Sequence, residues 1–175
     1  NVDTKRAELL TRAAENTDTL KLSSTGHRRE HSLEVQLPFL QVVLGNISIV
    51  PVVMGNQDKI NIESLGNALG SAFRNDNVLI VANTDLSHYH DYNTASALDR
   101  KVVEYVEKFD ILSFIDAVDK ESVEMCGGGP VAAAMIACSL FGANKSKVLC
   151  YGNSGDTSGD RGAVVGYLSA VFYNQ

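Results

Sequence analysis

The strongest constraint on the fold is an alternation of short apolar runs with longer segments of helical periodicity. Residues 47–54 and 78–82 are short and rich in β-branched side chains, which is typical of buried strands. Pro51 favours an edge position or a bulge for the first of them. Residues 62–73, which lie between the two runs, have apolar side chains on one helical face. This order predicts an α/β fold with a mostly parallel central sheet flanked by helices.

The rest of the chain extends this pattern. Helices are predicted over residues 3–15, 33–44, 93–109, 111–118 and 131–141, and Pro38 places the first turn of the second helix near the proline. Residues 147–151 and 164–172 are predicted strands with no helix between them, which favours an antiparallel edge. No repeat or linker interrupts the sequence, so residues 1–175 are expected to form one domain.

Composition excludes several classes of protein. The net charge of −6 disfavours nucleic-acid binding, which needs clustered Lys and Arg. No apolar run approaches the roughly 20 residues of a membrane span, and no signal peptide is recognisable. Three cysteines without a CxxC motif argue against a disulfide framework and indicate a cytoplasmic protein.

The densest polar cluster, residues 83–92, directly follows the predicted strand 78–82. Ligands of open α/β sheets bind beyond the carboxyl ends of strands. Asp85, His88, His90 and Asp91 could therefore supply a general base or metal ligands. The alternative is a polar loop that caps the next helix.

A second cluster, residues 26–34, carries His27 and His31 at a spacing of four. On a helix the two would share a face and could clamp a metal ion. Arg28 stands where the HExxH motif requires Glu, so a solvated helix start is the favoured interpretation.

The third cluster is Cys126 followed by three glycines and Pro130, at the start of a predicted helix. A helix N-terminus favours a thiolate, so Cys126 could be a ligand or a nucleophile, and the glycines would let a ligand approach the backbone closely. An incidental cysteine in a glycine turn is the alternative. Cys138 and Cys150 are expected to be inert core residues, and residues 154–160 a tight turn rather than a calcium site.

Together these segments resemble the Memo family, also known as AmmeMemoRadiSam system protein B. The matching stretches are EHSLEVQLPFL at residues 30–40, NTDLSHY at residues 83–89, CGGGPV at residues 126–131, YGNSGD at residues 151–156 and VVGY at residues 164–167. The resemblance covers essentially the whole chain in the expected order, and its most specific part is the first stretch.

The resemblance implies a fold like that of the class III extradiol dioxygenases, which hold non-haem iron. It implies His31 and Cys126 as metal ligands, His88 as the acid/base and Asp85 as its neighbour that orients it or the metal. A further His ligand, expected in an upstream HAGY-like segment, is missing from this chain. A thiolate with imidazole suits iron or copper, with zinc as the less favoured ion.

Three functions are compatible with this resemblance. The first is a metal-dependent oxidoreductase that uses iron or copper. The second is a non-catalytic module that binds a peptide or a small molecule in the former active-site cleft, with a functional link to a radical SAM protein. The third, a zinc hydrolase, would require His27 and His31 to lie on one inward helix face.

Overall fold

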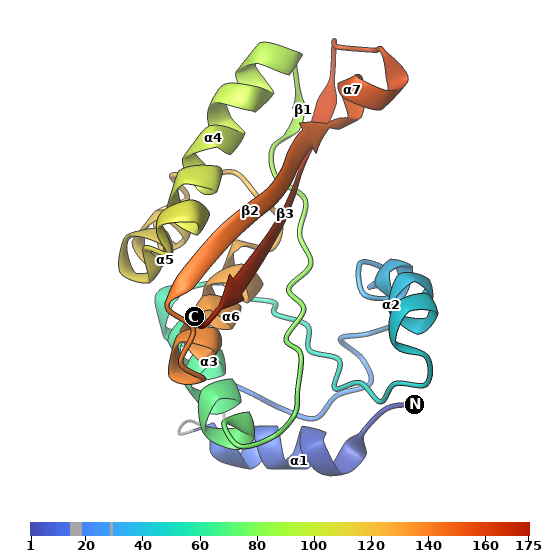
Figure 1. Ribbon diagram of the computed structural model, residues 1–175, viewed down its shortest axis with the longest axis vertical. Coiled ribbons are helices and arrows are strands. Elements are labelled where there is room, and N and C mark those ends of the chain that lie inside the picture. The colour runs from blue at the N-terminus through green and yellow to red at the C-terminus, as the bar shows by residue number, and fades with distance from the viewer. Residues whose placement is uncertain (15–18, 29) are drawn as a thin grey trace.

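The computed structural model describes residues 1–14, 19–28 and 30–175, and within them the chain is a mixed α/β structure (Figure 1). Its helices are α1 (Thr4–Ala13), η1 (Glu34–Gln36, a 3-10 turn), α2 (Leu37–Leu44), α3 (Lys59–Phe73), α4 (Tyr92–Lys108), α5 (Ile111–Asp119), α6 (Gly128–Leu140) and α7 (Ser154–Ser158). Its strands are β1 (His88–His90), β2 (Lys145–Asn153) and β3 (Val164–Tyr173). The predicted helices are all present; the predicted end of the first, Glu15, lies outside the described residues.

Side-chain caps explain where several helices begin. Asp3 accepts a hydrogen bond from the backbone N–H of Arg6 at 3.0 Å, and Asp110 accepts one from Ser113 at 3.2 Å. Asp91 does the same for the start of α4, where it accepts from Asn93 and Thr94. These bonds satisfy N–H groups that have no partner within the helix.

The main core lies among α3, α4, α5 and α6 and the inner face of the β2–β3 pair. Its fully buried members come mostly from these helices: Ile62, Leu86, Val102, Val106, Phe114, Ile115, Ala132 and Met135. A second, smaller cluster joins α1 to α3 through Leu10, Ala14, Ala68 and Phe73. Among these helices, α4 and α6 contact the β2–β3 pair directly, while α3 and α5 pack against other helices of the core.

The sheet is antiparallel in the described part of the chain, with the strand order β1–β3–β2. β2 and β3 form a long pair from Lys145↔Tyr173 to Asn153↔Gly166, with an irregularity between Val148 and Cys150. This confirms the predicted antiparallel pair at the C-terminal end. Short β1 pairs with the beginning of β3 and places residues 88–90 at that end of the sheet.

The two strands predicted over residues 47–54 and 78–82 do not form. Residues 78–82 are an extended trace between α3 and β1 (Figure 1), and no strand of the described chain pairs with them. In the first segment Ile49 makes only an isolated parallel bridge to Val2. Apolar β-branched runs favour an extended backbone, but a strand also needs a neighbour for its backbone hydrogen bonds. A parallel central sheet is therefore not observed among the described residues.

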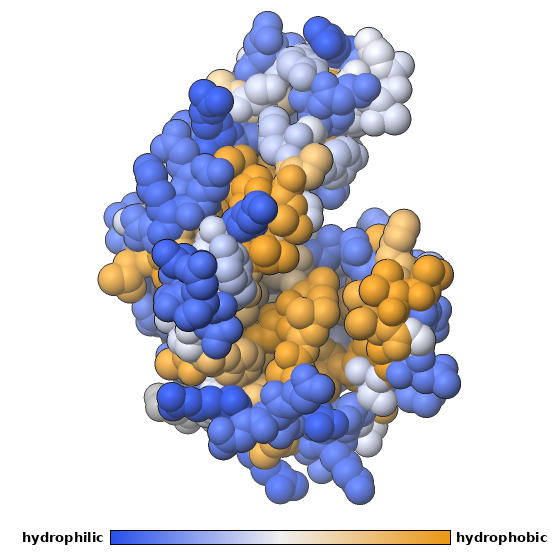
Figure 2. Space-filling model, in the orientation of Figure 1, coloured by the Kyte–Doolittle hydropathy of each residue, from blue (hydrophilic) through white to orange (hydrophobic). Residues whose placement is uncertain are grey.

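One face of the molecule is unusually apolar. Helix α2, all of whose residues are described, buries none of them, and Phe39, Val42 and Val43 are each more than 70% exposed. Figure 2 shows apolar residues gathered over α2 and, across a hollow, over the middle of the same face. The extended segment adds exposed Leu79 and Val81. Surfaces of this kind usually mark interaction sites. No helix among the described residues has the length and apolar character needed to cross a bilayer.

Candidate metal centre

Three side chains from two distant segments meet at one point. One ligand atom each from Asp85, His88 and Cys126 lies within 4.8 Å of the others. His88 Nε2 and Asp85 Oδ2 are 3.8 Å apart. Asp85 and His88 are half-buried, and Cys126 is exposed, so the cluster is open to solvent on one side.

The loop that carries Asp85 and His88 is anchored to β3. Leu86 donates its N–H to the Gly166 carbonyl at 2.9 Å, and Gly166 donates to the Ser87 carbonyl at 3.0 Å. Fully buried Asp99 of α4 accepts the Ser87 N–H at 2.9 Å and the Tyr151 hydroxyl at 2.8 Å. Burial is the main cause that raises the pKa of Tyr151, and the hydrogen bond to Asp99 also raises it. Backbone pairing and a buried carboxylate therefore fix residues 86–87.

Beyond this anchor the backbone turns sharply at Tyr89. Tyr89 has φ +62° and is 77% exposed, and its ring lies 5.8 Å from the ring of His88, so little burial supports its left-handed conformation. For a bulky residue this conformation costs about 1–2 kcal/mol. Glu124 holds both neighbours: its Oε1 accepts the His88 N–H at 3.0 Å, and its Oε2 lies 2.9 Å from His90 Nε2. The N–H of His88 is the main cause that lowers the pKa of Glu124.

Cys126 is tied to the Asp85 segment by two reciprocal hydrogen bonds. The Asp85 N–H donates to Cys126 Sγ at 3.2 Å, and the Cys126 N–H donates to the Asp85 carbonyl at 3.2 Å. Thr84 Oγ1 accepts the N–H of Gly127, the N-cap of α6, at 2.8 Å. The start of α6 and the loop after residue 82 therefore form one unit.

The glycines after Cys126 serve packing. A Cβ at Gly127 would lie 2.8 Å from the Asn83 carbonyl oxygen, and one at Gly129 would lie 2.5 Å from Met54 Sδ. Gln57 bridges the same loop, donating to the Cys126 carbonyl at 2.8 Å and accepting the Gly129 N–H at 2.7 Å. The space expected for a ligand is filled by the protein's own residues.

His31 does not join the cluster. It is exposed, and the segment that carries it is a turn, in which Glu30 accepts the N–H groups of His31 and Ser32. Asn83 Nδ2 donates to the Ser32 carbonyl, so this turn lies against the loop of the metal centre. Residues 26–28 also form a turn and Arg29 lies outside the described residues, so His27 and His31 are not presented by a helix. The condition for the zinc clamp is not met.

The structure also tests the expectations for Cys150, Cys138 and residues 154–160. Cys150 is exposed on β2, which corrects its assignment to the core. Cys138 is partly buried, and burial raises the pKa of its thiol. Residues 154–158 form the short helix α7 instead of a tight turn, with Asn153 and Asp156 as its capping box.

Two residues of the centre were not predicted. Asp99 shares the helix face of Ala95, Val102 and Val106, and a lone carboxylate on an apolar face was a signal in the sequence. Glu124 gave no signal, because its partners come from a different segment of the chain.

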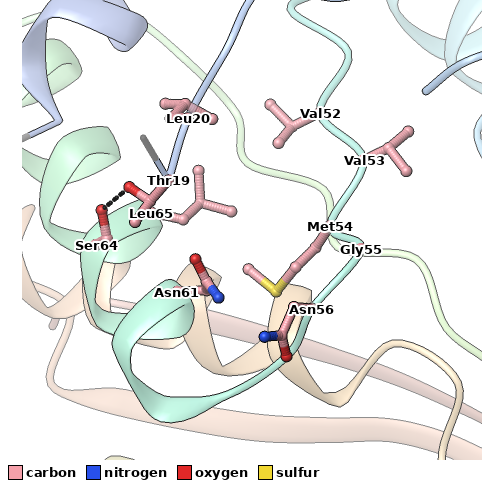
Figure 3. Close-up of a pocket in the computed structure, with 10 residues that line it drawn as sticks. All are labelled: Thr19, Leu20, Val52, Val53, Met54, Gly55, Asn56, Asn61, Ser64 and Leu65. Carbon is pink, nitrogen blue, oxygen red and sulfur yellow. Dashed lines mark hydrogen bonds between the residues drawn. The ribbon is translucent and has the colours of Figure 1, made fainter. Parts of the chain in front are cut away.

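A pocket of about 260 Å³ lies apart from the metal centre (Figure 3). Residues 52–56 line one side, and the other side includes Asn61 and Ser64 of α3. None of the three clustered side chains lines it.

The donor set fits a transition metal. Thiolate and imidazole suit iron, copper or zinc, and a carboxylate is a common third ligand of iron and zinc. Three side chains on one side leave further coordination positions open, which is the arrangement of catalytic rather than structural metal sites.

The chain is similar to a known family along its length. The family model described as "Memo-like protein" matches residues 1–171. A MEMO1 family protein of Methanopyrus kandleri is 41% identical over 151 residues, which are 85% of this chain and 53% of that protein. One of Methanothermobacter thermautotrophicus is 37% identical over 168 residues (95% and 60%), and one of Thermotoga neapolitana is 46% identical over 148 (83% and 51%). The chain thus spans about half the length of the curated relatives it matches.

Proposed function

Because this chain belongs to the Memo-like protein family, we propose that it is a metal-dependent oxidoreductase whose metal is held by Asp85, His88 and Cys126. The observation that carries the proposal is the convergence of three different donor groups within 4.8 Å. Such mixed clusters of His, Cys and carboxylate at the end of an anchored loop are the usual basis of metal sites.

The roles of the residues follow from their positions. Cys126 and His88 would be the two tightest ligands, and Asp85, 3.8 Å from His88, would be the third. We therefore assign His88 as a metal ligand, instead of the acid/base role that the resemblance implies. His31 stays a prediction: its turn lies against the loop of the centre and could bring its imidazole to the metal as a fourth donor. Iron or copper, when bound, would supply one-electron redox chemistry.

Metal analysis tests this proposal. Protein purified without added metal is expected to carry iron or copper at up to about one ion per chain, and His88→Ala should retain less than about a tenth of it. His27→Ala, a half-buried histidine of the turn at residues 26–28, is the control and should keep the full amount. Equal metal content in wild type and His88→Ala would contradict the site.

We also propose that residues 47–54 and 78–82 become strands of a parallel, dioxygenase-like sheet when further strands pair with them. The support is the extended backbone, the exposed Leu79 and Val81, and relatives about twice as long as this chain. Amides of residues 79–81 should exchange with solvent quickly in this chain, and at least about tenfold more slowly in a polypeptide of the relatives' length. Equal rates in both would contradict this pairing.

A further inference from the structure

We propose that Glu124 is a positioning residue that aims His88 at the metal centre. Glu124 lies two residues before Cys126, on the same loop, and does not itself contribute to the three-residue cluster. The inference rests on the proposed metal function, since positioning matters only if His88 is a ligand.

The first argument is the pair of contacts that Glu124 makes. Its Oε1 accepts the His88 N–H at 3.0 Å, and both of its oxygens lie within 3.1 Å of His90 Nε2. One carboxylate thus holds the residues on both sides of Tyr89.

The second argument is the conformation between those two contacts. Tyr89 is left-handed, and β1 pairs with β3 irregularly across it, with His88 opposite Val165 and His90 opposite Val164. Because the Tyr89 ring is largely exposed and lies against its neighbour His88 at 5.8 Å, burial contributes little to this turn. Besides the pairing with β3, the contacts of Glu124 on either side hold this turn, and their loss would free the His88 backbone to shift relative to Asp85.

The third argument is the origin of the carboxylate. Glu124 comes from the loop that also presents Cys126, so a shift of this loop moves the sulfur and the His88 backbone together. Outer partners of this kind orient metal ligands, and their loss usually reduces metal affinity by about 10- to 100-fold.

The test is a titration with Co²⁺, whose thiolate charge-transfer and d–d absorption bands report a Cys ligand and the coordination geometry. Glu124→Ala should bind Co²⁺ about 10- to 100-fold more weakly and with an altered d–d spectrum. Glu124→Gln keeps an acceptor for the His88 N–H and a group that can bond His90, and it should restore affinity to within about threefold of wild type. Glu107→Ala, an exposed glutamate of α4, is the matched control and should leave binding and spectrum unchanged.

Amide exchange of His88 in the metal-free protein separates this inference from the proposed function. The His88 amide should exchange at least about tenfold faster in Glu124→Ala than in wild type. If the wild type binds no Co²⁺, the metal function fails, and with it the positioning role, while faster exchange would still show the backbone contact. If the wild type binds Co²⁺ and Glu124→Ala binds it equally well with the same spectrum, Glu124 is not a positioning residue.

Discussion

Replacing Cys126 with alanine is expected to weaken metal binding more than any other single change in the proposed centre. The thiolate is its strongest ligand for a transition metal, and the two remaining donors, Asp85 and His88, lie on one loop. We expect Cys126→Ala to lower the affinity for Co²⁺ by about 100-fold or more, equivalent to about 2.7 kcal/mol, and to remove the thiolate absorption band.

Cys150→Ala is the matched control for this change. Cys150 is also an exposed free cysteine, but it lies on β2 and outside the cluster. Its replacement should leave the affinity and the absorption band unchanged. A thiolate band that persists in Cys126→Ala and disappears in Cys150→Ala would place the metal elsewhere.

The largest expected effect on stability is that of Gly166→Ala. A Cβ at this position would lie 2.0 Å from Asp99 Oδ2 and 2.7 Å from Asp99 Cγ. The aspartate cannot move aside easily, because it is fully buried and bonded to Ser87 and Tyr151. Gly166 is held from the other side by Leu86 and Ser87. We expect a loss of about 3 kcal/mol in the free energy of unfolding, or about 6–12 °C in Tm, measured by chemical and thermal denaturation.

Gly55→Ala gives the comparison for this substitution. Apart from its two chain neighbours, no residue has an atom within 4 Å of the position that its Cβ would occupy, so the free energy of unfolding should change by less than about 0.5 kcal/mol. Equal stability of Gly166→Ala and wild type would show that β3 is not packed against Asp99 as described.

Local signals in the sequence were sufficient to predict the helices. Asp3 and Asp110 begin helices as N-caps, Pro38 lies in the first turn of α2, and Gly45 ends it. Each of these effects acts within one or two turns of the chain, so it can be recognised without knowledge of the tertiary structure.

The central strands could not be predicted in the same way. Residues 78–82 have the apolar, β-branched character of a buried strand, yet Leu79 is 71% exposed and the segment has no paired neighbour in the described chain. The side-chain pattern indicates a tendency toward an extended backbone, whereas strand formation depends on a partner strand, which is often distant in the sequence. Residues 164–172 were predicted correctly because their partner, β2, is close in sequence.

The convergence of Asp85, His88 and Cys126 could be predicted from the sequence only in part. Asp85 and His88 are three residues apart in a conspicuous polar loop, and Cys126 stood out at the start of a helix. Their convergence depends on β3, Asp99 and Glu124, which hold the loop from three other segments. The turn that carries His31 lies beside this loop through Asn83, but its histidine is exposed.

Alkylation of the cysteines with and without metal tests the central claim most directly. In metal-free protein Cys126 and Cys150 are exposed and should both react with iodoacetamide, whereas half-buried Cys138, whose thiol pKa is raised by burial, should react slowly. Saturating Co²⁺ should slow the alkylation of Cys126 by about tenfold or more and leave Cys150 unchanged, as read by peptide mass spectrometry. Unchanged alkylation of Cys126 at saturating metal would contradict a site built from Asp85, His88 and Cys126.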